Sequence, residues 1–103
     1  MMSPKEIQHD RLVVLLAKQL IENREFDVVY TNVQYSTRNM NGEIDVLASK
    51  GRVPRYTFFE VKVNNGWEKA EEQYERWLNA AGYTRDEADG YIVSGDYLQR
   101  RKL

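Results

Sequence analysis

Two carboxylates and one ammonium group stand out in the sequence because they lie within apolar segments. Glu60 and Lys62 occur in the run Tyr56–Val63, whose β-branched and aromatic composition is typical of a strand. Side chains two positions apart on a strand project from the same face, roughly 7 Å apart along it. Glu60 and Lys62 can therefore share one site.

Asp45 supplies the second carboxylate, from the run Glu43–Ala48, which also reads as a strand. If Asp45 faces the same way as Glu60, two carboxylates and the Lys62 ammonium converge on a mostly apolar sheet. Such oxygen ligands suit Mg²⁺, which keeps several waters and takes only one or two protein carboxylates before it binds a substrate phosphate. A bound metal would activate a water and polarise the phosphate, while Lys62 positions the water or neutralises developing charge. The predicted chemistry is phosphodiester hydrolysis.

An ordinary ion pair on a solvated strand face is the simpler interpretation of Glu60 and Lys62. The apolar residues around the pair weigh against it: Phe58, Phe59, Val61 and Val63. Burying charge in such company is costly without a functional reason. Asp45 could likewise be an exposed acid, so the prediction depends on the three residues together.

Capping signals and apolar spacing predict the elements that position these residues. Ser3-Pro4-Lys5-Glu6 has the form of a capping box and starts a helix that runs to about Asn23. The polar stretch 36–42, which ends in Asn41-Gly42, predicts a chain reversal. Strand-like segments lie at residues 26–35, 43–48 and 56–63.

A second helix is predicted from Trp67 until Gly82 stops it, and it should cover the sheet. Tyr91–Val93 is predicted as the last strand, and Asp96 as the cap of a helix toward Leu103. The resulting order αβββαβ predicts an α/β fold, a single domain over residues 1–103 whose mixed central sheet is flanked by helices.

Composition restricts the function classes. With 15 basic and 16 acidic residues the net charge is −1, which alone argues weakly against a nucleic-acid partner. Acidic residues that hold divalent metals become a positive site, so the count understates attraction at a metal-dependent centre. The chain has no Cys and no apolar run long enough to span a membrane. We therefore expect no membrane association and a cytoplasmic location, in the host cell if the source is viral.

Two segments together resemble a known family. Gly42-Glu43-Ile44-Asp45 followed by Phe59-Glu60-Val61-Lys62 is similar to the PD-(D/E)xK nuclease superfamily in its Gly-Glu-Ile-Asp variant. The order αβββαβ matches its restriction-endonuclease-like core, over nearly the whole chain. Ile stands where the family name has proline, which leaves the aspartate intact. The resemblance implies that Asp45 and Glu60 bind Mg²⁺, with Mn²⁺ as a substitute, and that Lys62 is catalytic.

Many members of this superfamily add a carboxylate or histidine from the first helix to the metal shell, and Glu6, His9 and Asp10 compete for that role. His9 is the preferred candidate because it lies 3, 4, 7 and 11 residues before Leu12, Val13, Leu16 and Leu20, on the apolar stripe. A lone histidine there could equally be a satisfied boundary residue. Capping accounts for Glu6, and favourable electrostatics at the helix N-terminus accounts for Asp10.

Gln73, four residues before Trp77, resembles the Gln-x-x-x-aromatic feature that follows the catalytic lysine in several branches of the superfamily. This implies that Gln73 orients the lysine or contacts phosphate. A surface glutamine on the flank of the buried stripe is an equal alternative. Trp77 is predicted to be a core residue.

The chain also resembles stand-alone VRR-type nucleases and archaeal-type Holliday-junction resolvases, which act as homodimers on branched DNA. A minimal domain has few means of reading bases, so recognition of DNA shape is expected. Two copies about a two-fold axis would present two active sites to a symmetric junction. Candidate phosphate contacts, each of which could be only a solvated charge, are Arg38, Asn41, Lys50, Arg52, Lys69 and Arg76, with Arg38 and Lys69 preferred.

Two alternatives stay open. A nuclease for end or flap processing, or for defence, would act as a monomer on ends or flaps. A non-catalytic DNA-binding or assembly protein on the same fold belongs to another class, and an unrelated binding domain with a surface ion pair would show neither cleavage nor metal-dependent stabilisation.

Overall fold

The computed structural model describes residues 2–51, 55–63, 66–95 and 97–103. Helix α1 spans Pro4–Glu22, and the Ser3 side chain caps it by accepting a hydrogen bond from the Glu6 backbone N–H. The helix ends at the cap residue Asn23. Its start, its end and the buried positions Leu12, Val13, Leu16 and Leu20 are as the sequence predicts, but Leu15 and Ile21, which were expected to widen the buried stripe, are exposed.

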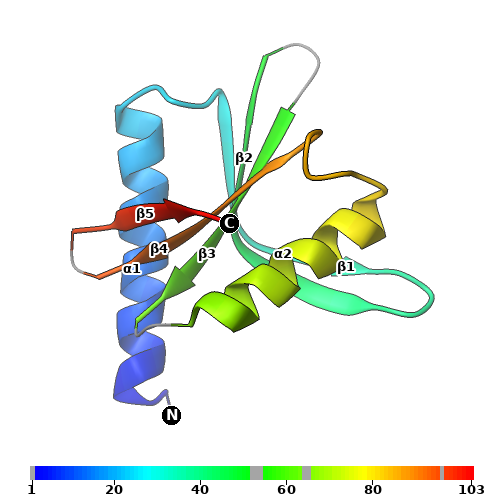
Figure 1. Cartoon of the computed structure of the whole chain (residues 1–103). Helices are drawn as coiled ribbons and strands as arrows, with labels where there is room; N and C mark the ends of the chain where they lie inside the picture. The colour runs from blue at the N-terminus through cyan, green and yellow to red at the C-terminus, as the bar shows by residue number, and fades with distance from the viewer. Residues whose placement is uncertain (1, 52–54, 64–65, 96) are drawn as a thin grey trace.

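The five strands form one mixed sheet in the order β1-β2-β3-β4-β5. Strands β3 and β4 are parallel, and every other neighbouring pair is antiparallel. Helix α2, Trp67–Ala81, makes the crossover that a parallel pair requires (Figure 1). The strands span Val28–Ser36, Asn41–Lys50, Arg55–Lys62, Asp89–Ser94 and Gln99–Lys102.

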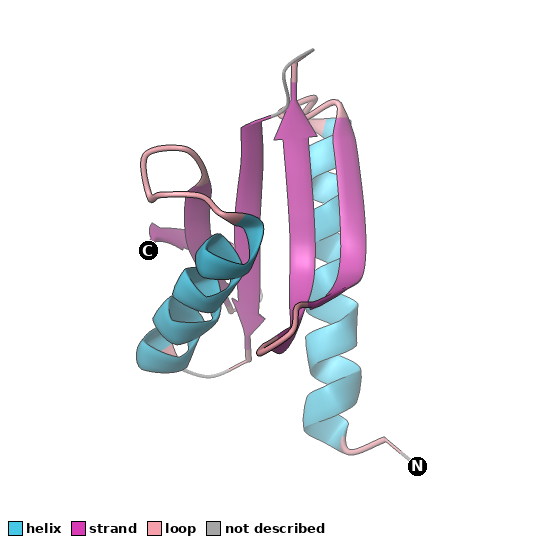
Figure 2. Ribbon diagram, turned by 90° about the vertical axis from the view of Figure 1, so that its right-hand side faces the viewer, coloured by secondary structure: helices cyan, strands magenta, loops and turns pink. Residues whose placement is uncertain are grey.

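The sheet lies between the two helices (Figure 2), so each face has its own apolar cluster. Alternate residues of β3 supply both clusters, Phe59 and Val61 on one face and Phe58 on the other. We call them the α1-side cluster (Leu12, Val13, Leu16, Leu20, Val46, Ala48, Phe59, Val61, Val93) and the α2-side cluster (Ile44, Leu47, Phe58, Tyr74, Trp77, Leu78, Ala88). The protein is thus a small α/β domain with β3 at its centre, and Trp77 is a core residue as predicted.

Strand β2 changes its facing at Asp45. Ile44 belongs to the α2-side cluster and Val46 to the α1-side cluster, whereas a regular strand places residues two apart on the same face. The paired positions of β2 and β3 run from Lys50 to Val46 and stop there. On the neighbouring strand β1, Asn32 has a φ of 51°, in the left-handed region. Asp45 therefore lies where the ladder is interrupted, and its side chain takes neither regular direction.

The C-terminus differs from the prediction. Residues 99–102 form strand β5, which pairs antiparallel with β4, and not a helix. Gly95 and Leu98, with φ of 78° and 52°, reverse the chain, and the Leu98 N–H donates to the Gly95 carbonyl. A segment this short gains more by pairing with the open edge of β4 than by nucleating an isolated helix. The predicted helix cap, Asp96, lies outside the described residues.

The chain reversal predicted within residues 36–42 is confirmed, but Asn41 and Gly42 lie outside the turn itself. The chain reverses over Thr37–Met40, where the Thr37 N–H donates to the Met40 carbonyl at 2.7 Å. Asn41 and Gly42 already belong to β2. Gly42 is needed there for space and not for turn geometry, because the ring of Tyr35 lies directly over its Cα.

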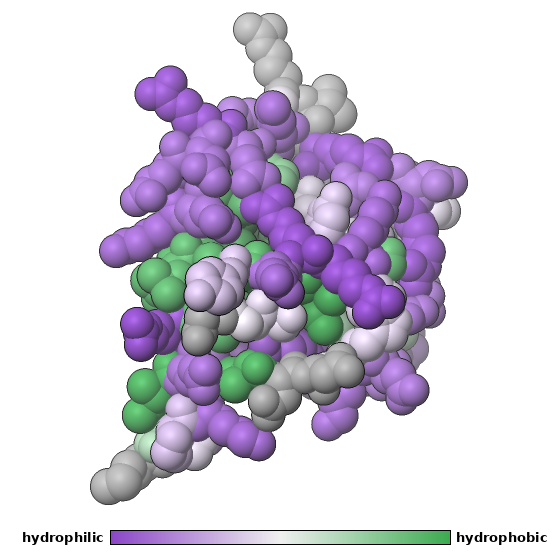
Figure 3. Space-filling view, turned by 60° about the vertical axis from the view of Figure 1, so that its left-hand side comes forward, coloured by the Kyte–Doolittle hydropathy of each residue, from purple (hydrophilic) through white to green (hydrophobic). Residues whose placement is uncertain are grey.

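No helix in the described residues is sufficiently long and apolar to cross a membrane. Hydrophilic residues cover most of the face in Figure 3, and apolar residues show between them in small groups. The exposed large apolar residues of α1 and the segment before it are Met2, Ile7, Val14, Leu15 and Ile21. The predicted homodimer stays a prediction.

Candidate active site

Asp45 is held by one contact from the neighbouring strand β3 and one from helix α1. Its Oδ2 accepts a hydrogen bond from the Val61 backbone N–H of β3 at 2.8 Å. The same oxygen lies 3.1 Å from Nε2 of His9 on α1, where an Nε2–H donates to the carboxylate. Where the ladder is interrupted, the Asp45 carboxylate replaces a backbone carbonyl as the acceptor for the Val61 N–H, so this buried N–H keeps a hydrogen-bond partner.

Glu60 is the most deeply buried acid of the site, with 4% of its surface exposed. Burial raises the pKa of Glu60 to about 9, and the nearby Asp45 carboxylate adds to that rise against the opposing effect of the Lys62 ammonium. Two carboxylates forced together in low dielectric favour a proton or a cation between them. The sequence-based expectation that Asp45 and Glu60 converge therefore agrees with the geometry.

Lys62 and Gln73 complete the surroundings of Glu60. Lys62 Nζ lies 3.7 Å from Glu60 Oε1, and its side chain is only partly exposed. With its amide nitrogen turned toward the acid, Gln73 of α2 lies 3.2 Å from Oε1 and 2.9 Å from Oε2. Gln73 thus contacts the Glu60 carboxylate, and its implied role toward the lysine or a phosphate stays a prediction.

The predicted accessory residues fall into two groups. Glu6 is exposed and contacts Ser3, whose Oγ lies 3.2 Å from Glu6 Oε1. Asp10 is also exposed, and its Oδ1 lies 3.5 Å from Nδ1 of His9. Among the three first-helix candidates, therefore, His9 alone reaches Asp45. Asn41 is engaged with Ser36 at 2.9 Å on the hairpin.

The other candidate phosphate contacts are charges at the surface. Lys69 and Arg76 are exposed on α2, and Lys50 is exposed at the end of β2. Arg38 is exposed in the turn between β1 and β2. Arg52 lies outside the described residues.

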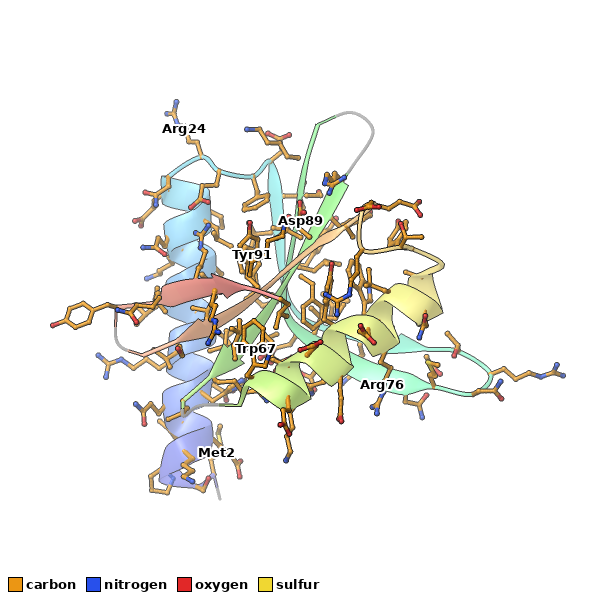
Figure 4. All side chains as sticks on the ribbon, in the orientation of Figure 1. Met2, Arg24, Trp67, Arg76, Asp89 and Tyr91 are labelled. Carbon is orange, nitrogen blue, oxygen red and sulfur yellow. The ribbon has the colours of Figure 1, made fainter. Side chains whose placement is uncertain are left out.

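Tyr35 also approaches this centre, which the sequence reasoning missed. Its pKa is raised by burial and by the charge of Glu60 and lowered by Arg76, so the hydroxyl lies within the field of both groups. Arg76 stands on the flank of α2 (Figure 4), and Tyr35 packs against the α2-side cluster. Gly42 two residues after the hairpin turn was the available signal, because a side chain there would overlap with Tyr35.

Gly42→Ala should therefore lower the free energy of unfolding by about 1–3 kcal/mol, because the new methyl group displaces the Tyr35 ring. Urea unfolding followed by circular dichroism measures this cost. In a Tyr35→Ala background the same substitution should cost much less, since the overlapping atoms are gone. Equal costs in both backgrounds would show that Tyr35 does not occupy the space above Gly42.

The donor set fits a hard divalent cation. Among residues 2–51, 55–63, 66–95 and 97–103, no group of three or more His, Asp and Glu side chains stands ready to hold a metal. The site offers Asp45 and Glu60, two oxygen donors for a cation that keeps several waters, with His9 already bonded to one of them. A divalent cation would also remove the repulsion that raises the pKa of Glu60.

No protein-family model matches the chain, and no curated protein matches it. Among solved structures the chain is similar to the crystal structure of a protein of unknown function, AF1548, with a TM-score of 0.56 and 24% identity. The match covers 84% of this chain, which spans 46% of the length of that protein. The likeness supports the α/β fold and carries no information on activity.

Proposed function

We propose that this chain is a metal-dependent nuclease of the PD-(D/E)xK superfamily, with the restriction-endonuclease-like fold, that hydrolyses phosphodiester bonds in branched DNA. One observation carries the proposal: Asp45, Glu60 and Lys62 converge where β2 and β3 separate, beside His9 and Gln73. A structural ion pair explains only Lys62 with Glu60. It does not explain a second carboxylate beside the first in a buried place.

In this mechanism Asp45 and Glu60 would hold Mg²⁺ or Mn²⁺, and the bound metal would supply positive charge at the phosphate and acidify a water. Lys62 holds the attacking water in place and stabilises the charge that develops on the phosphate oxygens. Water adds to phosphorus as the bond to the leaving oxygen breaks, which yields one strand end with phosphate and one with hydroxyl. Gln73 orients Glu60, and His9 orients Asp45.

The charges of α2 indicate how DNA approaches. Lys69, Gln73 and Arg76 are four and three residues apart, so they share one flank of the helix, the flank that reaches Glu60. The outward face of α2 is acidic and repels phosphate: it carries Glu68, Glu71, Glu72 and Glu75. We infer that the backbone passes along the Gln73 flank toward the β1–β2 hairpin, with Arg38 at its far end.

The decisive experiment incubates the purified protein with labelled four-way junction, flap, linear duplex and single-stranded DNA, with Mg²⁺ or with chelator. Paired symmetric nicks on the junction alone, lost with chelator, are the expected result and would support a dimeric resolvase. Lys62→Ala should lose the activity, because the developing charge then has no partner.

Other outcomes separate the alternatives. Cleavage of flaps or ends instead of junctions would keep the catalytic centre and replace the junction with another branched or terminal substrate. Binding without cleavage of any of the four DNAs would support a non-catalytic DNA-binding role. If the protein neither bound nor cut any of the four DNAs, the proposal as a whole would be contradicted.

A further inference from the structure

Trp67, the first residue of α2, lies at the surface beside the proposed catalytic centre. It is only partly buried and belongs to neither the α1-side nor the α2-side cluster, in contrast to Trp77. The guanidinium of Arg101 on β5 lies 4.4 Å from the centre of the Trp67 ring, and Trp67 lies between α2 and β5 in Figure 4. The pair forms a stack of an aromatic ring and a planar cation that the apolar core does not use.

The stack is close to the catalytic lysine. A Cβ at Gly66, the residue before Trp67, would lie 3.1 Å from Cδ and 3.3 Å from Cε of Lys62, so this part of the chain packs on the Lys62 side chain. In the sheet, Glu60 pairs with Ile92 and Ile92 with Arg101, one row across three strands. Adjacent strands are roughly 4.8 Å apart, which places the backbones of Glu60 and Arg101 about 10 Å from each other. Arg101 therefore lies two strands from the proposed metal ligand Glu60.

A cavity is available at the same place. It has a volume of about 540 Å³, the size of a small-ligand site, and is lined by Gly66, Trp67, Glu68 and Lys69. The aromatic wall suits a nucleobase, and the Glu68 carboxylate disfavours a phosphate in the cavity itself. Lys69, on the catalytic flank of α2, can hold the backbone outside it.

We propose that Trp67 and Arg101 form a stacking subsite for one unpaired nucleobase of DNA, next to the phosphodiester bond that the site cuts. The proposal rests on the nuclease function proposed above and narrows its substrate class. Aromatic rings and guanidinium planes stack on any base, but only when the base is unpaired and splayed from its neighbours. The preferred substrates are therefore branched DNAs that offer an unpaired nucleotide at the branch.

Binding is tested without cleavage by titrating the purified protein with a short oligothymidylate in chelator. Tryptophan fluorescence and the anisotropy of a labelled oligonucleotide report the binding. We expect quenching in the wild type, loss of quenching in Trp67→Leu, and a roughly 10-fold weaker Kd in Trp67→Leu and in Arg101→Gln. Lys102→Gln is the matched control, because it removes one positive charge from the same strand and leaves the stack in place. Wild-type Kd in both Trp67→Leu and Arg101→Gln would overturn the proposal.

A cleavage experiment distinguishes failure of the stacking subsite from failure of the proposed nuclease function. With Mg²⁺, a four-way junction carrying one unpaired thymidine at each branch should be cut faster than a fully paired junction by the wild type, and at the same rate by Trp67→Leu. Cleavage of both junctions at equal rates by the wild type would overturn the subsite and leave the nuclease standing. Quenching that depends on Trp67, without cleavage of any DNA, would support the subsite and contradict the nuclease.

Discussion

Asp45→Asn and Glu60→Gln are each expected to reduce DNA cleavage by roughly 10³-fold or more, while DNA binding is preserved or becomes tighter. Each substitution removes one of the two oxygen anions that the proposed metal needs. Asp45→Asn also removes a negative charge that repels the phosphate backbone, and Glu60→Gln does so wherever a bound metal keeps Glu60 ionised. Both variants should fold, because the amide keeps the shape and the hydrogen-bond acceptor of the acid it replaces. Single-turnover cleavage and anisotropy with the same labelled junction measure the two effects.

The control for this pair is Asp86→Asn. Asp86 is an exposed acid in the turn before β4, outside the site, and its substitution changes the net charge by the same amount. It should leave cleavage within a factor of two or so of wild type, as expected of a surface substitution. Unchanged cleavage in both Asp45→Asn and Glu60→Gln would sink the assignment of the catalytic centre.

The metal-free protein is expected to become less stable as the pH rises from 5 to 9. The pKa of Glu60 is raised from 4.5 to about 9 by burial and by Asp45, so between these values the folded state binds a proton that the unfolded chain has lost. The free energy of unfolding therefore falls with pH until the folded pKa is passed. We expect a fall on the order of 3 kcal/mol, which lowers Tm by roughly 10–20 °C. Thermal unfolding in chelator at several pH values measures it.

Glu60→Gln should remove most of this slope, because its amide does not titrate, and should be more stable than wild type at pH 8. Glu72→Gln, at an exposed position of α2, should keep the wild-type slope. Saturating Mg²⁺ or Mn²⁺ should raise the Tm of the wild type most at high pH, where the carboxylates are free to bind it. A slope that persists in Glu60→Gln would mean that another group titrates.

Local signals in the sequence predicted most of the fold. The capping box at Ser3 and the apolar spacing from Leu12 to Leu20 determine α1 through contacts within one helix, and Gly82 ends α2 for a similarly local reason. The prediction of a C-terminal helix was wrong because the structure that forms instead depends on a contact with another strand and not on signals within the segment itself. Residues 99–102 form β5 only because the edge of β4 is beside them, and no pattern in four polar residues reports that neighbour.

The candidate site was predictable where it depends on residue type and less so where it depends on an irregularity. Glu60 and Lys62 share a face by simple alternation, as expected from Tyr56–Val63. The prediction for Asp45 required that it face the same way as Glu60. Instead its side chain takes neither regular direction, and the break between Ile44 and Val46 brings its carboxylate next to Glu60. Tyr35 went unnoticed because its position depends on the missing side chain of Gly42, a long-range packing effect that turn statistics do not contain.

Because Oδ2 of Asp45 is also the acceptor for the Val61 N–H, one atom belongs both to the proposed chemistry and to the integrity of the sheet. Amino-acid substitution at position 45 is therefore limited both by the proposed chemistry and by the stability of the sheet. A relative that gives up cleavage but keeps the fold should carry another acceptor here, such as Asn, Ser or Thr, since an alanine or valine would leave a buried N–H without a partner. If a related sequence lacked Glu60 and Lys62 but kept a hydrogen-bond acceptor at position 45, we would interpret it as a non-catalytic relative descended from a nuclease.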